Sequence, residues 1–255
     1  MNLVGHCLLF TLGANVLAVC LWLLVRRFCS LERRLVSNNV SSSYFNTIGT
    51  VYAVVLGFML FDVWGDFQNA ARTVEMEAGA LAEIARISSG YAPPLRASLQ
   101  KAVHDYAQAV VDYEWQAMQE GGTSPQAAQA YSKLWQIITS VKPISQWEII
   151  MHGHVIDAAM DLMKHRRLRE LKARSSLPPI LWIVLWVGGI ITVGFSCFFG
   201  VEQDHMHLFK IVCLTTMVFI VVFSVWEIYG PFQGSVTVTP DAFHLLLRQL
   251  ETSAF

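Results

Sequence analysis

One stretch of this chain carries polar and small residues at a spacing that could border a path for ions. The residues are Asn46, Thr50, Ala53 and Gly57, within an otherwise apolar segment. On a helix they fall within about 60° of one another, and bulkier residues cover the opposite side. Such a stripe can face a water-filled axis shared between subunits. It can equally let helix backbones pack closely in a membrane, where Gly49 would join it, and packing is the commoner use of this pattern.

Two aromatic residues farther along the same stretch, Phe61 and Trp64, could narrow such a path to a hydrophobic constriction. Aromatic side chains near the end of a membrane span more often anchor it in the interface. The sequence leaves both interpretations open.

A second group of residues has the types that bind divalent metals. His154, Asp157, Asp161 and His165 lie three and four residues apart, so one helix face would carry all four. A single helix cannot easily complete a coordination shell, and no second cluster with matching spacing occurs between residues 66 and 175. We therefore favour a solvated helix face over a metal site.

A run of basic residues precedes the third apolar block. It consists of Lys164, Arg166, Arg167, Arg169, Lys172 and Arg174. Clusters of this kind beside a span bind anionic lipid headgroups and fix the topology of the chain. Concentrating anions at the mouth of a pore is a sharper, less common alternative.

Motifs that carry catalysis are absent from the sequence. It has no glycine-rich phosphate loop ending in Gly-Lys-Ser/Thr, no nucleophile elbow and no metalloprotease helix. The net charge of −1 argues against general nucleic-acid binding. We expect no enzyme activity, no cofactor and no nucleic-acid partner.

Composition places these residues in a membrane protein. The chain is 54% hydrophobic and only 15% charged, and its apolar residues concentrate in four blocks. Each block is long enough to cross a bilayer, and they cover residues 3–25, 44–64, 180–199 and 208–226 approximately. The sequence thus predicts an all-α membrane protein with four transmembrane helices and a soluble helical bundle inserted between the second and third spans.

This fold divides the chain into four parts. We expect a transmembrane hairpin over 1–65, a soluble helical insert over 66–175, a second hairpin over 176–230, and a C-terminal turn, short strand and amphipathic helix over 231–255.

One long helix is expected to join the second span to the insert. Its seam repeats every 3.5 residues, as in a helix that keeps one side against a partner. The seam consists of Asn46, Thr50, Ala53, Gly57, Leu60, Trp64, Phe67, Ala71, Val74, Ala78, Leu81 and Ala85. None of the twelve is charged, whereas acids such as Glu75 and Glu77 fall off the seam. The pattern predicts about 40 helical residues, roughly 60 Å, preceded by a polar loop over 37–43.

Local signals divide the insert into further helices. Pro93 opens one whose apolar seam ends with Tyr106, Ala109 and Tyr113. Ser124 should cap the next helix, and Ser145 with Glu148 forms a capping box before the last. Residues 235–238 alternate like a short strand.

Several motifs then resemble a known family. They are the run Thr47 to Phe58, Val74-x-x-Glu77-Ala78-x-x-Leu81, Glu114-Trp115, Leu177-Pro178-Pro179-x-Leu181-Trp182, Phe199-Gly200-Val201-Glu202 and Pro231-Phe232-x-Gly234. In this order they resemble the bacterial bestrophin-like domain-of-unknown-function family, over about residues 37–245. The resemblance implies four spans, a helical insert and, by analogy, an oligomeric channel for chloride or other small anions. The family commonly has an Asp-Arg pair before the Pro-Phe turn, where this chain has Tyr229-Gly230, so any contact made by that pair is in doubt here.

The leading functional hypothesis is a homo-oligomeric anion channel in the lipid bilayer of the cell inner membrane, with the second spans around its axis. The alternative is a membrane-anchored interaction or signalling scaffold whose helical insert binds a partner. Four spans place both termini and the insert on one side. Eight basic residues near span ends lie on that side against four on the other, which favours the cytoplasm.

Overall fold

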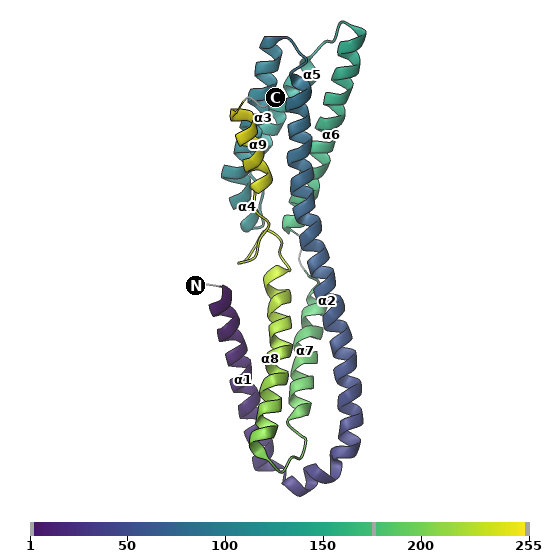
Figure 1. Ribbon diagram of the computed structural model, residues 1–255, viewed down its shortest axis with the longest axis vertical. Coiled ribbons are helices and arrows are strands. Elements are labelled where there is room, and N and C mark those ends of the chain that lie inside the picture. Colours follow the sequence, from purple (N-terminus) through teal and green to yellow (C-terminus); the bar gives the residue numbers. More distant parts are fainter. Residues whose placement is uncertain (1–2, 175–176, 253–255) are drawn as a thin grey trace. The chain divides into compact units, whose positions relative to one another are not determined.

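The computed structural model describes residues 3–174 and 177–252, and within them all regular secondary structure is helical, with no strand (Figure 1). The elements are α1 (Leu3–Phe28), α2 (Leu31–Ser88), α3 (Pro93–Ala109), a π-helical turn η1 (Val110–Glu114), α4 (Trp115–Gln119), α5 (Pro125–Ser140), α6 (Gln146–Arg174), α7 (Pro179–Ser196), α8 (Asp204–Ile228) and α9 (Asp241–Glu251). Four of them, α1, α2, α7 and α8, are long and apolar enough to cross a membrane. The predicted fold class is confirmed.

The chain folds into two compact units. The membrane unit contains residues 1–65 and 177–229, and the insert unit contains residues 66–176 and 230–255. Helix α2 contributes its first part to the membrane unit and its remainder to the insert unit. The last part of the chain completes the insert unit, so that unit is built from two segments distant in sequence.

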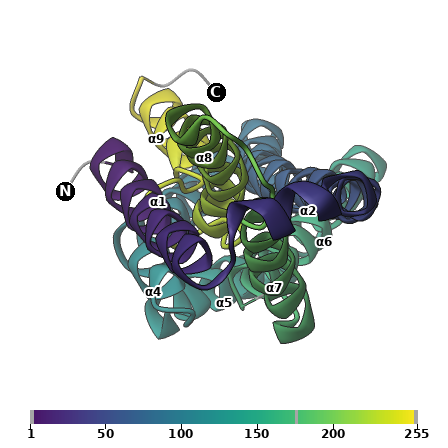
Figure 2. The same ribbon diagram turned by 90° about the horizontal axis from the view of Figure 1, so that it is seen from below.

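In the membrane unit, α1 and α8 lie side by side and α7 packs against both (Figures 1 and 2). Phe10 of α1 makes edge contacts with Trp186 of α7 and Phe219 of α8. The Asn15 side-chain amide donates to Thr216 Oγ1 at 3.0 Å. Ring packing and an interhelical hydrogen bond therefore join these helices, as expected where lipid removes the hydrophobic drive for association.

Two glycines of α7 let α2 approach closely. A Cβ atom at Gly188 would lie 2.4 Å from the Tyr52 ring, and one at Gly189 would lie 2.9 Å from the Tyr52 hydroxyl. That hydroxyl donates to Leu185 O at 2.8 Å. Tyr52 thus fixes which face of α2 points into the membrane unit.

The start of α2 differs from the prediction. Residues 37–43, expected as a polar loop, are helical, because α2 begins at Leu31. Asn38 from this region donates to Gly200 O at 2.7 Å and accepts from Gly200 N at 2.9 Å. A Cβ atom at Gly200 would lie 2.5 Å from Leu35 N, so only glycine allows this contact. The polar residues that suggested a loop instead dock the helix onto the segment between α7 and α8.

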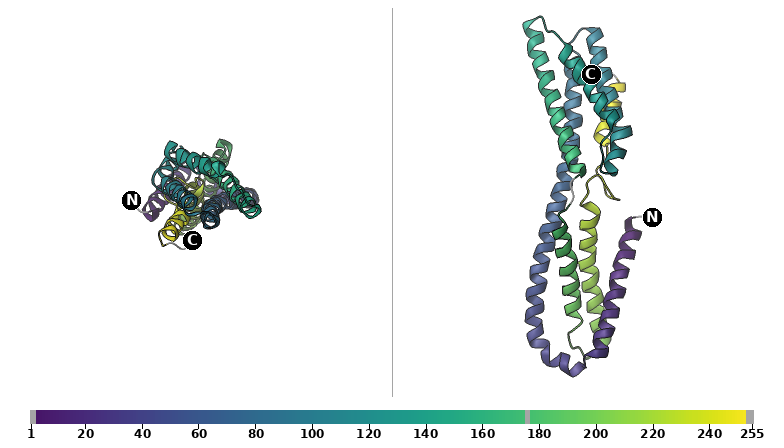
Figure 3. Two further views of the ribbon diagram at one scale, coloured as in Figure 1. Left: turned by 90° about the horizontal axis from the view of Figure 1, so that it is seen from above. Right: turned by 180° about the vertical axis from the view of Figure 1, so that it is seen from behind.

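In the insert unit, the second part of α2 packs with α3, α5, α6 and α9, and Figure 3 shows these helices from two further directions. The seam of α2 is buried here at Val74, Ala78, Leu81 and Ala85, as predicted. Both predicted caps are present. Ser124 Oγ accepts from Ala127 N at 3.3 Å, Ser145 Oγ accepts from Glu148 N at 3.1 Å, and Ser145 N donates to Glu148 Oε2 at 3.1 Å.

The π-helical turn corrects the predicted seam of the following segment. Tyr113, expected in the core, is 52% exposed, and Glu114 is fully buried instead. A π turn carries one residue more than the α-helical period, so every later residue shifts its face by one position. The core face therefore continues with Glu114, Trp115 and Met118.

The predicted strand over 235–238 is wrong, because no strand occurs in the described part of the chain to pair with it. The segment is a connection that turns back on itself, with Val238 N donating to Pro231 O at 2.7 Å. Trp115 Nε1 donates to Val238 O at 3.3 Å, and the Trp115 ring packs edge-on against Phe232 and Phe243. These contacts attach the end of the chain to the insert unit.

Candidate functional site

The stripe predicted from the sequence lies on an uncovered face of α2. Tyr52, Leu56, Met59 and Val63 turn into the membrane unit and are buried. Asn46, Thr50, Ala53 and Gly57 are all exposed. At about 100° per residue, the centre of this stripe lies roughly 120° around the helix from the buried face.

The glycines on this side of α2 face open space, and the threonine hydroxyl of the stripe already has a hydrogen-bond acceptor. A methyl group added at Gly49 or Gly57 would meet no atom within 4 Å. Thr50 Oγ1 donates to Asn46 O at 2.7 Å, so its hydroxyl hydrogen bond is satisfied within the helix. At the far end of the span, Phe61 is 77% exposed and Trp64 is 47% exposed. The structure brings all six predicted residues onto the part of α2 that other helices of the membrane unit leave uncovered.

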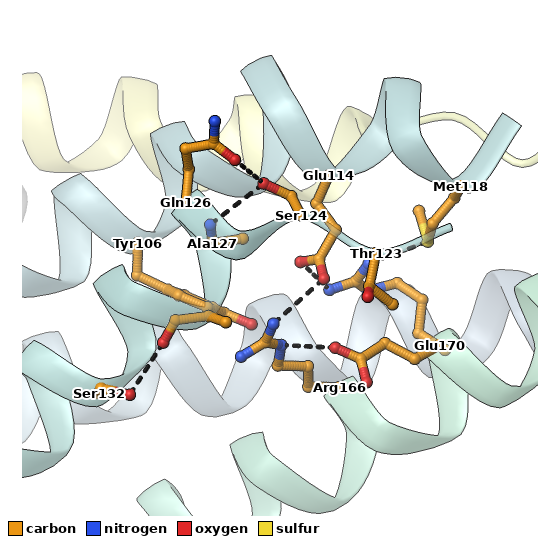
Figure 4. Close-up of polar contacts among 12 residues, drawn as sticks. Tyr106, Glu114, Met118, Thr123, Ser124, Gln126, Ala127, Ser132, Arg166 and Glu170 are labelled. Carbon is orange, nitrogen blue, oxygen red and sulfur yellow. Dashed lines mark hydrogen bonds and ion pairs between the residues drawn. The ribbon is translucent and has the colours of Figure 1, made fainter. Parts of the chain in front are cut away.

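A second constellation, in the insert unit, was missed by the sequence reasoning. Five charged side chains alternate in sign in the order Glu77, Arg169, Glu114, Arg166 and Glu170, and we call them the charge ladder. Arg169 Nε and Nη2 donate to the two Glu77 oxygens at 2.6 and 3.0 Å, and Nη2 also donates to Glu114 Oε2 at 3.0 Å. Arg166 Nη2 donates to Glu114 Oε1 at 3.2 Å, and its Nε lies 3.0 Å from Glu170 Oε1 (Figure 4).

Aromatic and sulfur groups close the inner end of the ladder. The Tyr106 hydroxyl donates to Glu77 Oε1 at 2.6 Å, and Arg169 Nη1 lies 3.0 Å from Met118 Sδ. The Arg169 guanidinium also lies over the Trp115 ring at 5.8 Å. Glu77, Arg169 and Glu114 are completely buried, so each depends on these contacts to retain its charge.

The pKa shifts show how strongly the ladder holds its charges. Burial opposes the charge on Arg169, but Glu77 outweighs it and holds the pKa of Arg169 well above its ordinary value. Burial also works against ionisation of Glu114, yet Arg169 and Arg166 keep the pKa of Glu114 below its ordinary value. Burial, assisted by Glu77, raises the pKa of Tyr106, which therefore stays a neutral hydrogen-bond donor.

The ladder corrects two residues of the predicted lipid-binding run. Arg166 is 8% exposed and Arg169 is fully buried, so neither contacts lipid headgroups. Arg166 and Arg169 lie on the same face of α6 as the buried residues Leu162 and Ala173, and buried carboxylates pair with the two arginines. Lys172 forms an ion pair with Asp66. Lys164, Arg167 and Arg174 are exposed.

The metal hypothesis gains no support from the geometry. His154, Asp157 and Asp161 are exposed along α6, and His165 is partly buried. Within the described ranges, no three His, Cys, Asp or Glu side chains lie close enough to hold a metal ion.

A signal for the ladder was present in the sequence. Glu77 and Glu114 both occur inside apolar motifs that suggested the family, and the 3.5-residue spacing of α6 runs directly through Arg166 and Arg169. Charged residues are almost never fully buried unless they are paired, so acids and arginines inside apolar patterns suggest buried ion pairs.

Four span-length helices with a helical insert between the second and third define a class, the polytopic helical membrane proteins with a soluble insert. Within that class, the family model for the bestrophin-like domain matches residues 12–243, so this chain belongs to the bestrophin-like family. The resemblance inferred from the motifs is thereby confirmed. A comparison with curated proteins finds no match.

Solved structures have the same fold. A crystal structure of a bacterial bestrophin homologue from Klebsiella pneumoniae, phased with zinc, has a TM-score of 0.70 at 14% identity and covers 98% of each chain. A variant of that homologue has a TM-score of 0.70 at 12% identity, covering 100% of this chain and 99% of the other. A variant described only as a membrane protein has a TM-score of 0.73 at 12% identity, covering 97% and 98%.

Proposed function

We propose that this protein is a homo-oligomeric ion channel of the inner membrane that passes chloride or other small anions. The second spans of several subunits would surround the conducting axis. The observation that carries the proposal is the uncovered stripe of Asn46, Thr50, Ala53 and Gly57.

The argument rests on the faces of α2. One face is committed to its own membrane unit through Tyr52 and its neighbours. A second exposed face carries bulky apolar residues, including Val51 and Phe58, which suit lipid or a neighbouring subunit. The stripe is the face with small and polar side chains, and such side chains allow water and ions to pass close to a helix. In this arrangement Phe61 and Trp64 form the narrow hydrophobic part of the path. The alternative role of the stripe, helix packing together with Gly49, would apply to contacts between subunits.

The proposed orientation places the termini and the insert unit in the cytoplasm. Lys164, Arg167 and Arg174 are exposed along α6, the helix that precedes the third span in the sequence. They would contact anionic lipid headgroups there. These charges also support the choice of anions as the conducted species.

A rival function receives support from one feature of the insert unit. A groove of about 670 Å³ lies between α2 and α9 and is lined mainly by apolar side chains, among them Val74, Ala78 and Leu246. A scaffold that binds a partner helix would use such a surface. A monomer or a dry pair of α2 helices in solution would favour this rival function.

Ion flux from liposomes tests the proposal. The purified protein is reconstituted with chloride inside, and efflux is followed with a chloride electrode at several gradients and pH values. We expect flux that depends on the amount of protein. Absence of flux under all these conditions would contradict a channel.

Variants of α2 locate the path. Thr50→Phe and Gly57→Leu add bulk to the stripe and should reduce flux at least about tenfold, because a filled axis excludes hydrated ions. Val51→Phe adds bulk to the other exposed face and serves as the matched control, with flux near the wild-type level. Light scattering should give the same oligomer for all variants. Equal flux through all three variants would contradict the proposal that the stripe lines the conducting path.

A further inference from the structure

The charge ladder has an imbalance in its charges. With every member ionised, the three carboxylates of Glu77, Glu114 and Glu170 face only the two guanidiniums of Arg166 and Arg169. The phenols of Tyr106 on α3 and Tyr131 on α5 are also packed against them and are neutral near pH 7. Arg167 lines the same open pocket as Glu170, but it is exposed, and among the described residues no ion pair joins it to Glu170. A ladder that is buried at one end therefore carries one negative charge in excess.

The excess charge cannot sit at the inner end. Glu77 receives two hydrogen bonds from Arg169 and one from Tyr106, and Glu114 receives one from each arginine. Protonating either carboxylate would sacrifice charge-assisted hydrogen bonds in a fully buried place. Glu114 accordingly remains ionised, and Glu77 keeps its three hydrogen-bond donors.

The outer end differs in both contacts and access. Glu170 has one ion-pair partner, Arg166, at 3.0 Å, and its side chain is 28% exposed. It lines an open pocket of about 510 Å³ together with Thr123, Tyr131 and Arg167. Figure 4 shows Arg166 between Glu114 and Glu170, so the two acids share one guanidinium. A proton from solvent can reach Glu170 with no rearrangement of the core.

We propose that Glu170 is the proton-binding residue of the insert unit, and that its protonation balances the charge ladder and stabilises this unit as the pH falls. The proposal does not depend on ion conduction by the membrane unit. The electrostatics agree with it, because burial and then the neighbouring Glu114 raise the pKa of Glu170 above its ordinary value despite the lowering effect of Arg166.

The sign of the effect follows from this shift. A carboxyl whose pKa is higher in the folded state binds its proton more tightly there than in the unfolded chain. Glu170 therefore contributes stability that is complete below its unfolded pKa and is lost as the pH rises through the raised value. Glu114 acts in the opposite sense, since its lowered pKa stabilises the fold above the ordinary carboxyl range and loses that contribution in stronger acid. The two together predict a stability maximum on the mildly acidic side.

Unfolding of the full-length protein in detergent tests the assignment. The wild type, Glu170→Gln and a matched control, Glu83→Gln, are unfolded at pH values from about 5 to about 8. Glu83 lies on the exposed side of α2 in the same unit. Glutamine mimics the protonated acid, so Glu170→Gln should be more stable than wild type at high pH, and the difference should shrink as the pH falls. The gain or loss of one proton changes the unfolding equilibrium constant by at most tenfold per pH unit. The stability difference between wild type and Glu170→Gln therefore cannot change with pH more steeply than this.

An infrared measurement keeps the test independent of stability. The wild type should show a protonated carboxyl C=O band that grows on acidification, and Glu170→Gln should lack this component. Parallel stability curves for wild type and Glu170→Gln, or an infrared titration unchanged by the substitution, would overturn the proposal.

Discussion

Arg169 is the residue on which the interior of the insert unit most depends. Its guanidinium contacts two carboxylates, a thioether and an indole ring, and none of its surface reaches solvent. Desolvating such a charge is costly, and only its contacts compensate for it. Removing it leaves two buried acids with fewer cations than they require.

We therefore expect Arg169→Met to lower the free energy of unfolding by about 3–5 kcal/mol. Arg167→Met is the matched control, because Arg167 is an exposed arginine on the same helix, and its effect should be within about 0.5 kcal/mol of zero. Chemical denaturation of both variants measures the difference.

A second substitution separates charge from packing. Adding Glu77→Gln to Arg169→Met removes one unpaired acid while an amide can still accept from Tyr106. Stability should recover in part. If both arginine variants unfold at the same denaturant concentration, the ladder has no energetic role.

At the scale of the element, the π-helical turn determines which side chains of the residues after it face the core. Residues 110–114 hold one more residue than an α-helix would, and this brings Glu114, Trp115 and Met118 to the core. Removing one exposed residue of this turn should restore a regular α-helix while keeping those three side chains inward.

Deletion of Asp112 is consequently expected to be tolerated. Asp112 is exposed, and its side chain accepts a hydrogen bond from Gln108 at the surface. Deletion of Lys133 from the regular helix α5 is the matched control, because it turns one half of that helix by about 100° and displaces Leu134 and Ile138. Each displaced side chain costs about 1.5–3 kcal/mol. Melting temperatures decide the comparison, and an Asp112 deletion as damaging as the Lys133 deletion would argue against the phase shift.

The elements also show what the sequence could and could not predict. The four spans, the buried seam of α2 and the caps at Ser124 and Ser145 follow from local patterns, since periodicity and capping chemistry act over a few residues. The π turn has no such pattern, so Tyr113 was placed inside and Glu114 was overlooked. Apart from the i,i+4 pair of Arg166 and Glu170, the contacts of the charge ladder join residues 52 to 92 positions apart, and no local rule pairs Glu77 with Arg169.

At the scale of the whole molecule, four spans require both termini and the insert unit to share one side of the membrane. The predicted side is the cytoplasm. Single cysteines test it at Ser42, which is exposed near the start of α2, and at Ser132, which is exposed on α5. The five native cysteines, Cys7, Cys20, Cys29, Cys197 and Cys213, are replaced beforehand.

A membrane-impermeant maleimide applied to intact spheroplasts should label Ser42→Cys and leave Ser132→Cys unlabelled until the membrane is opened. The unsubstituted cysteine-free protein controls for background. Labelling of Ser132→Cys alone would invert the orientation, and labelling of both from one side would contradict four spans.

The two-segment construction of the insert unit has a consequence for biosynthesis. Residues 66–174 leave the ribosome before the third and fourth spans are made, yet Trp115 gains its ring contacts with Phe232 and Phe243 only after those residues have been synthesised. Domains generally fold as units in the order of synthesis. Here the packing of the insert unit is completed only after the third and fourth spans have been synthesised.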